Sequence, residues 1–141
     1  MVEIVPNEAI LRAREALGLP ASVAGEALRI ERLDAPGSFY RVMLAPGGGG
    51  RRLALIDART GTLMQHAELG SGDGNLMVSR EQAITAAALG HRASARLVWR
   101  PSRASQSPLY PIWEVSAAGE RRYVDQQGQV WDVLSPTGRG G

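Results

Sequence analysis

The sequence contains no cysteine, no lysine and only two histidines, His66 and His91. Without cysteine, disulfides, thiol catalysis and thiolate metal sites are excluded. Neither histidine has another histidine near it in the sequence, whereas a zinc site normally uses three or four ligands at close spacing. We therefore read both histidines as surface residues, and we predict no metal site and no bound cofactor.

Long apolar runs are also lacking. No stretch approaches the roughly 18 apolar residues needed to span a bilayer. The opening segment "MVEIVPNEAI" carries acidic residues where a signal peptide has a basic start and an apolar core. We therefore expect this chain not to insert into a membrane. It could be a native cytosolic protein or the trimmed ectodomain of an exported one.

A concentrated positive charge is missing as well. All 16 basic residues are arginine, and they are offset by 14 acidic residues, which gives a net charge of +2. Nucleic-acid binding usually requires a concentrated basic face, so nucleic acid is not the expected partner. The hydrophobic fraction of 44% is ordinary for a folded protein. The 141 residues could form one domain or two small ones.

No catalytic signature is present. Gly47 to Gly50 precede Arg51 and Arg52, but a phosphate-binding loop needs Gly-Lys-Ser/Thr opening a helix, and this stretch opens an expected strand. No Gly-x-Ser-x-Gly motif occurs. Several carboxylates alternate with apolar residues or fall in loops, as on a solvated sheet face: Glu26, Glu31, Asp34, Glu114 and Asp132. No pair of them is marked for acid–base catalysis, so we predict that the protein is not an enzyme.

The same order of expected elements, one helix followed by four strands, occurs twice in the sequence. A helix is expected from Pro6 to Gly18, and a second one from its N-cap Ser79, with Gln82 completing a capping box, to Gly90. Four expected strands follow each helix: 26–33, 38–44, 51–57 and 62–69, then 94–100, 110–117, 121–125 and 129–134. We predict a first unit over 1–70, a Gly-rich linker over 71–76, and a second unit with a short C-terminal tail over 77–141.

The last two strands of each unit are joined by similar turns. In each, an apolar residue and an aspartate, Asp57 or Asp125, precede a short turn with Gly61 or Gly128. The carboxylates can cap the turn amides, and glycine takes the positive φ at little cost. Both pairs are therefore predicted to be β-hairpins.

These features make both halves resemble PepSY domains. The resemblance rests on the helix openings Glu8-Ala9-Ile10 and Gln82-Ala83-Ile84 and on the two closing hairpins. It implies an α+β fold of two cystatin-like repeats, each one helix packed on an antiparallel sheet of three to four strands. It also implies a non-enzymatic role in the bacterial cell envelope, including modulation of peptidases, with no catalytic residues to carry over.

Most aromatic residues belong to the second unit. Trp113 shares a strand face with Val115 and is expected in the core. The expected strand 129–134 is apolar on both faces, and its own helix can cover only one of them. The residues we predict at an interface with the first unit, a second chain or a partner are Trp131, Val133, Trp99 and Tyr110.

The sequence thus predicts a binding or regulatory module with a protein partner, outside the cytoplasm by the resemblance alone. Self-association remains open. An alternative is a binder of nucleic acid or another anionic polymer through arginines at matching strand starts: Arg51, Arg52, Arg121 and Arg122. Solvated strand ends are the simpler interpretation of those arginines. Binding of a polymer should weaken steeply with added salt.

Overall fold

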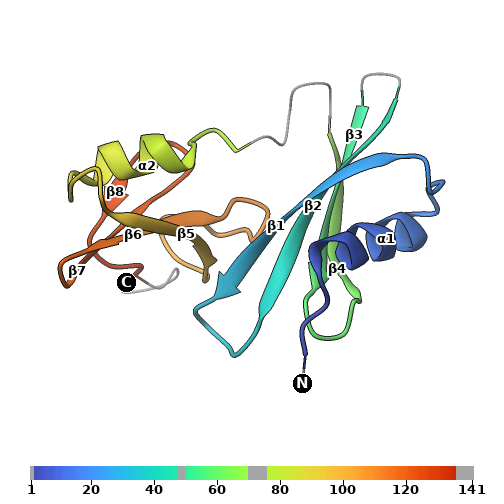
Figure 1. Ribbon diagram of the computed structural model, residues 1–141, viewed down its shortest axis with the longest axis horizontal. Helices are drawn as coiled ribbons and strands as arrows, with labels where there is room; N and C mark the ends of the chain where they lie inside the picture. Colours follow the sequence, from blue (N-terminus) through green and yellow to red (C-terminus); the bar gives the residue numbers. More distant parts are fainter. Residues whose placement is uncertain (1, 48–49, 70–75, 136–141) are drawn as a thin grey trace. The chain divides into compact units, whose positions relative to one another are not determined.

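The computed structural model describes residues 2–47, 50–69 and 76–135. The contacts divide the chain into two compact units (Figure 1). The first comprises Met1–Ile30 and Gly37–Asn75, and the second comprises Glu31–Pro36 and Leu76–Gly141. Residues 71–75 of the predicted linker and residues 136–141 of the predicted tail lie outside the described residues.

The first unit places helix α1, Pro6–Leu17, on a sheet of strands β1, Ala24–Arg32, β2, Ser38–Gly47, β3, Gly50–Asp57, and β4, Leu63–Leu69 (Figure 1). The helix ends as predicted, with Gly18 in the left-handed region at φ 67°. Its N-cap is Val5, which offers no side-chain hydrogen bond. The helix buries small residues against larger ones from the sheet, and the core consists of Ala9, Ala13, Val23, Tyr40, Val42, Leu44, Ala54, Ile56 and Ala58.

The second unit pairs helix α2, Arg80–Ala87, with strands β5, Ser94–Trp99, β6, Ile112–Ala117, β7, Glu120–Val124, and β8, Val130–Trp131. The predicted capping box between Ser79 and Gln82 is present. The helix ends earlier than predicted, with Ala88 rather than Gly90 as its left-handed C-cap. One face of the sheet packs on α2 through a core of Val78, Ala83, Ile84, Ala87, Ala93, Val115 and Val124.

The prediction of two cystatin-like repeats with separate antiparallel sheets is wrong. The strands form one eight-stranded mixed sheet in the order β4-β3-β2-β1-β5-β6-β7-β8. The parallel step is made by Glu31 and Arg32 at the end of β1, which pair with Val98 and Trp99 of β5. All four residues belong to the second unit. An edge strand has unpaired backbone donors and acceptors to which another strand can add. A parallel pair is not joined by a hairpin turn, so no turn motif in the sequence marks this pairing.

The two hairpin turns are built by their aspartates, as predicted. Asp57 accepts the backbone N–H groups of Arg59 and Thr60 at 2.8 and 3.0 Å. Asp125 accepts those of Gln127 and Gln129 at 2.9 and 3.0 Å. Partial burial would raise the pKa of Asp57, but these backbone hydrogen bonds outweigh it and lower that pKa. Gly61 and Gly128 take φ values of 74° and 84°.

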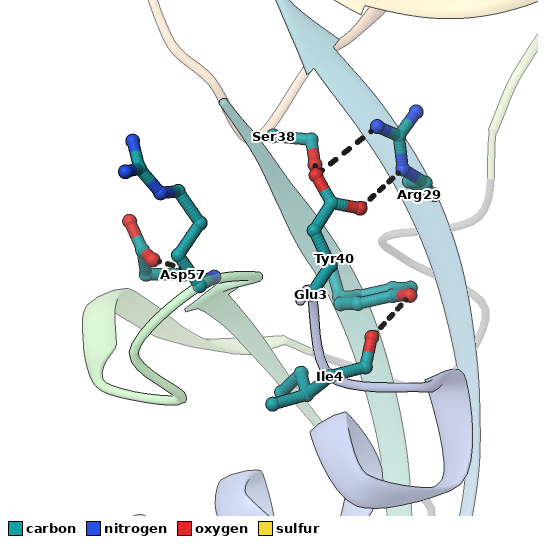
Figure 2. Close-up of polar contacts among 7 residues, drawn as sticks. Glu3, Ile4, Arg29, Ser38, Tyr40 and Asp57 are labelled. Atoms are coloured by element: carbon teal, nitrogen blue, oxygen red, sulfur yellow. Dashed lines mark hydrogen bonds and ion pairs between the residues drawn. The ribbon is translucent and has the colours of Figure 1, made fainter. Parts of the chain in front are cut away.

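The N-terminal segment of the first unit is held by Glu3 (Figure 2). Its carboxylate accepts two hydrogen bonds from Arg29, at 2.9 and 3.2 Å, and one from the Ser38 hydroxyl at 2.5 Å. The Tyr40 hydroxyl donates to the carbonyl of Ile4 at 2.8 Å. The hydrogen bonds from Arg29 and Ser38 lower the pKa of Glu3. The segment before α1 is therefore fixed to β1 and β2.

No helix within the described part of the chain is both long enough and apolar enough to traverse a bilayer.

Candidate functional site

The second unit contains a cleft between the loop that follows β5 and the turn that joins β7 to β8. Its volume is about 570 Å³. Residues of both walls and of the segment before α2 line it, and they are Met77, Arg103, Ala104, Ser105, Gln106, Ser107, Tyr110, Asp125, Gln126, Gln127, Gln129 and Trp131. All of them belong to the second unit.

Serine hydrogen bonds fix the loop wall of the cleft. Ser102 and Ser105 exchange backbone hydrogen bonds at 3.0 and 3.2 Å. The Ser105 hydroxyl lies 2.9 Å from the carbonyl of Ser107 and 2.7 Å from that of Tyr110, and it accepts the indole N–H of Trp99 at 3.3 Å. The loop that follows β5 is thus fixed by its own hydrogen bonds, and it holds Tyr110 in place.

The turn wall is fixed by Asp125 and Gln126. Asp125 is only 4% exposed, and its second carboxylate oxygen accepts the indole N–H of Trp131 at 2.9 Å. Gln126 accepts from the backbone N–H of Val78 at 3.1 Å and donates to the carbonyl of Pro111 at 2.9 Å. This amide joins the start of α2 to the start of β6, so the turn has a defined position against both.

The cleft presents apolar and amide side chains with little charge. Met77 is 75% exposed and Tyr110 is 55% exposed, while Trp131 is half-buried. Arg103 and Asp125 are the charged residues among those that line it. Both oxygens of Asp125 already accept hydrogen bonds, so its carboxylate is committed to the turn. Chemically, this surface can stack and pack against apolar groups and hydrogen-bond with amides.

The four residues predicted at an interface do not gather in one place. Trp131 and Tyr110 both line the cleft. Trp99 is 7% exposed and lies behind the loop, where it contacts Ser105. Val133 is 64% exposed but lines a separate pocket. The strand expected over 129–134 is only Val130–Trp131, because the chain then turns and Leu134 packs with Val98 and Ile112.

The sequence reasoning missed Met77 and the glutamines of the turn. Where the first hairpin has Ala58, Arg59 and Thr60 between aspartate and glycine, the second has Gln126 and Gln127, and Gln129 follows its glycine. This difference between two otherwise similar turns was a signal that could have marked the second one as specialised.

Glu114 corrects the expectation of a solvated carboxylate face. It is 5% exposed, and it accepts a hydrogen bond from Arg96 at 2.8 Å. That hydrogen bond raises the pKa of Arg96. Alternation along the strand placed Glu114 on the face away from α2, but the adjacent residues of β5 and β7 and the segment around Leu134 cover that face.

The matched arginines at the strand starts have partners within the chain. Arg52 lies 3.6 Å from Glu68, and Arg122 donates to the carbonyl of Ala87 at 2.5 Å. Arg121 lies 4.0 Å from Glu114. In the described residues, His66 and His91 are both exposed, and no group of three potential metal-ligating side chains is found.

No protein-family model matches the chain, and no curated protein matches it significantly. Among solved structures, a "putative lipoprotein" from Clostridium difficile 630 is similar over 93% of each chain, at 15% sequence identity and a TM-score of 0.42.

Proposed function

We propose that the protein is a non-enzymatic binding module of the bacterial cell envelope that holds a protein partner in the cleft of its second unit. The envelope location and a regulatory role toward a peptidase rest on the PepSY resemblance of the sequence. The binding role rests on the cleft. The observation that carries it is the exposure of Met77 and Tyr110 beside the half-buried Trp131.

Residues of these kinds dominate binding energy at protein interfaces. Tryptophan and tyrosine are enriched where one partner inserts an apolar group, and methionine adapts to the shape it meets. Here the aromatic side chains stand on walls that are already hydrogen-bonded, so little ordering is needed on binding. Gln127 and Gln129 add amides that match the backbone groups of an extended polypeptide.

The composition of the cleft also supports a role in binding rather than catalysis. Acid–base chemistry needs a positioned group that can accept or release a proton near neutral pH. Asp125 is the carboxylate among the lining residues, and three hydrogen bonds hold its two oxygens. The partner we propose is therefore an uncharged, apolar segment of a protein.

The test begins with peptides selected from a random display library on the whole protein. Their affinities are then measured for Tyr110→Ala and Met77→Ser, with Val133→Ser as the matched control. Loss of a central aromatic contact typically costs about 1–2 kcal/mol, so we expect binding about five- to thirtyfold weaker for Tyr110→Ala. Val133→Ser should bind as the wild type does, because Val133 lies outside the cleft.

Equal affinities for the wild type and both cleft variants would overturn the cleft as the binding site. Salt separates this proposal from binding of an anionic polymer, because only the latter weakens steeply with added salt. Fractionation of a bacterium that carries the gene tests the location. Recovery with the cytoplasmic proteins alone would contradict an envelope role.

A further inference from the structure

A second pocket of the second unit lies on the sheet face away from α2. The strand registers place Arg96 opposite Glu114 and Glu114 opposite Tyr123, so these side chains form a row across β5, β6 and β7. Arg121, two residues before Tyr123, shares the same face. With Arg100 they line a pocket of about 490 Å³ that is distinct from the cleft.

Glu114 forms the buried part of this pocket, and only one of its two carboxylate oxygens accepts a hydrogen bond from a described residue. Its Oε1 atom accepts the hydrogen bond from Arg96. Its Oε2 atom is buried and has no hydrogen-bond partner in the described part of the chain. The Nε atom of Arg121 is 4.0 Å from Oε2, beyond hydrogen-bonding distance. A buried carboxylate oxygen without a donor is costly, so this atom favours a ligand that donates a hydrogen bond.

Arg100, in the same pocket, has a hydrogen-bond donor that lacks an acceptor within the described chain. Its Nε atom is buried and has no acceptor among the described residues. The side chain of Arg121 is 61% exposed, so its guanidinium group can turn toward a ligand. Planar guanidinium groups bind carboxylates in two-pronged geometry. This part of the pocket therefore favours an anionic oxygen acceptor.

The balance of charged residues that line the pocket also favours a small anionic ligand. Three arginines line the pocket against two acidic residues, Glu114 and Asp132. Asp34, which also acts on Arg100 electrostatically, is itself paired with Arg32 at 3.0 Å. An ammonium donor would have to sit among guanidinium groups, whereas a hydroxyl donor adds no positive charge.

We infer that this pocket binds a small hydroxy-carboxylate, whose hydroxyl donates to Glu114 and whose carboxylate lies against Arg100 and Arg121. The inference is independent of the proposed partner cleft, since the two sites share no lining residue. It gives the module a small-molecule site beside its protein-binding surface.

Malate and succinate provide a matched pair of probes, because they share a four-carbon chain and two carboxylates and differ in one hydroxyl. Calorimetric titration of the whole protein, at fixed ionic strength and neutral pH, should show malate binding about tenfold more tightly than succinate. A site that satisfies a hydroxyl with a buried acceptor discriminates against the analogue that lacks it. Aspartate, which has an ammonium group in place of the hydroxyl of malate, tests whether a charged donor is preferred.

Two variants assign the roles. Arg100→Gln should weaken malate and succinate alike, because it removes a contact to the carboxylate. Glu114→Gln should abolish the preference for malate over succinate, since an amide that keeps its oxygen on Arg96 presents N–H rather than oxygen to the ligand. Arg103→Gln, in the separate cleft, is the control and should leave both affinities unchanged.

Circular dichroism melting shows whether each variant folds. If Glu114→Gln does not, the malate-to-succinate ratio of the wild type and the effect of Arg100→Gln still decide the matter. Equal affinity for the two acids, tighter binding of aspartate than of malate, or no binding of malate at about 1 mM would each overturn the inference.

Discussion

The buried carboxylate of Asp125 accepts the indole N–H of Trp131 at 2.9 Å, across the turn that both residues flank. The same carboxylate accepts two backbone N–H groups of that turn. One side chain thus fixes both the turn backbone and the aromatic ring that lines the cleft.

Replacement of Asp125 by alanine should lower the free energy of unfolding by about 2–4 kcal/mol, since it leaves three partly buried donors without an acceptor. Asp57→Ala is the matched control. It removes the corresponding turn cap of the first unit, where no indole is bound, and should cost about 1 kcal/mol. Urea denaturation of both variants measures the difference. Equal losses would show that the bond to Trp131 contributes nothing to stability.

Glu3 should make stability depend on pH in the acid range. Hydrogen bonds from Arg29 and Ser38 lower the pKa of Glu3 in the folded protein. Its contribution to stability is therefore complete above the pKa of the unfolded chain, near 4.5, and is lost as pH falls through the lower pKa of the folded protein. The contribution should be about 1 kcal/mol or less, because the pair with Arg29 is partly exposed. We expect Glu3→Gln to be less stable than the wild type at neutral pH and to match it at low pH. A difference that persists through the acid range would contradict this assignment.

Gly25 should not tolerate a methyl group. A Cβ atom there would lie 2.8 Å from Leu44 Cδ2 and 2.9 Å from Ile10 Cγ2, where α1 approaches β1 and β2. Overpacking of this kind typically costs about 1–3 kcal/mol, so Gly25→Ala should lower the melting temperature. Gly50→Ala is the control, because its nearest contact would be at 3.8 Å. Similar melting temperatures for the two variants would show that α1 moves away without cost.

Val5 offers a route to higher stability. It occupies the N-cap of α1 in an extended conformation, makes no side-chain hydrogen bond there and is 63% exposed. Serine at this position, three residues before Glu8, would create the kind of capping box that Ser79 and Gln82 form in α2. Val5→Ser should therefore stabilise the protein by about 0.5–1 kcal/mol, and Ser79→Ala should destabilise it by about 1 kcal/mol. An unchanged melting temperature in Val5→Ser would show that the new hydroxyl does not cap the helix.

Local features of this fold could be predicted from the sequence, but the connections between them could not. The capping box at Ser79 and the turn-capping aspartates depend on residues close together in the chain, and both are present. The parallel pairing of Glu31 with Val98 depends on two backbones far apart in sequence and leaves no mark in residue type. The resemblance to a two-repeat family therefore led to the wrong sheet.

The same limit applies to the candidate sites. Trp131 was predicted at an interface because its expected strand is apolar on both faces, and Tyr110 was predicted with it. Met77 reaches the cleft only through the position of the segment before α2. Glu114 looked solvated because alternation along β6 gives its face but not what covers that face. Its burial depends on Arg96 across the strand pair and on the return of the chain at Leu134.

The membership of Glu31–Pro36 in the second unit has a consequence for how the chain can be divided. A cut between Pro36 and α2 yields a C-terminal fragment without the backbone that pairs with β5 and without Leu33, which packs beside Val98 and Ile112. A cut before Glu31 keeps these residues but leaves most of the first unit attached. During synthesis these six residues leave the ribosome well before the strand they join. The second unit is therefore complete only when early and late parts of the chain are both present, and no single cut separates a whole second unit from the first.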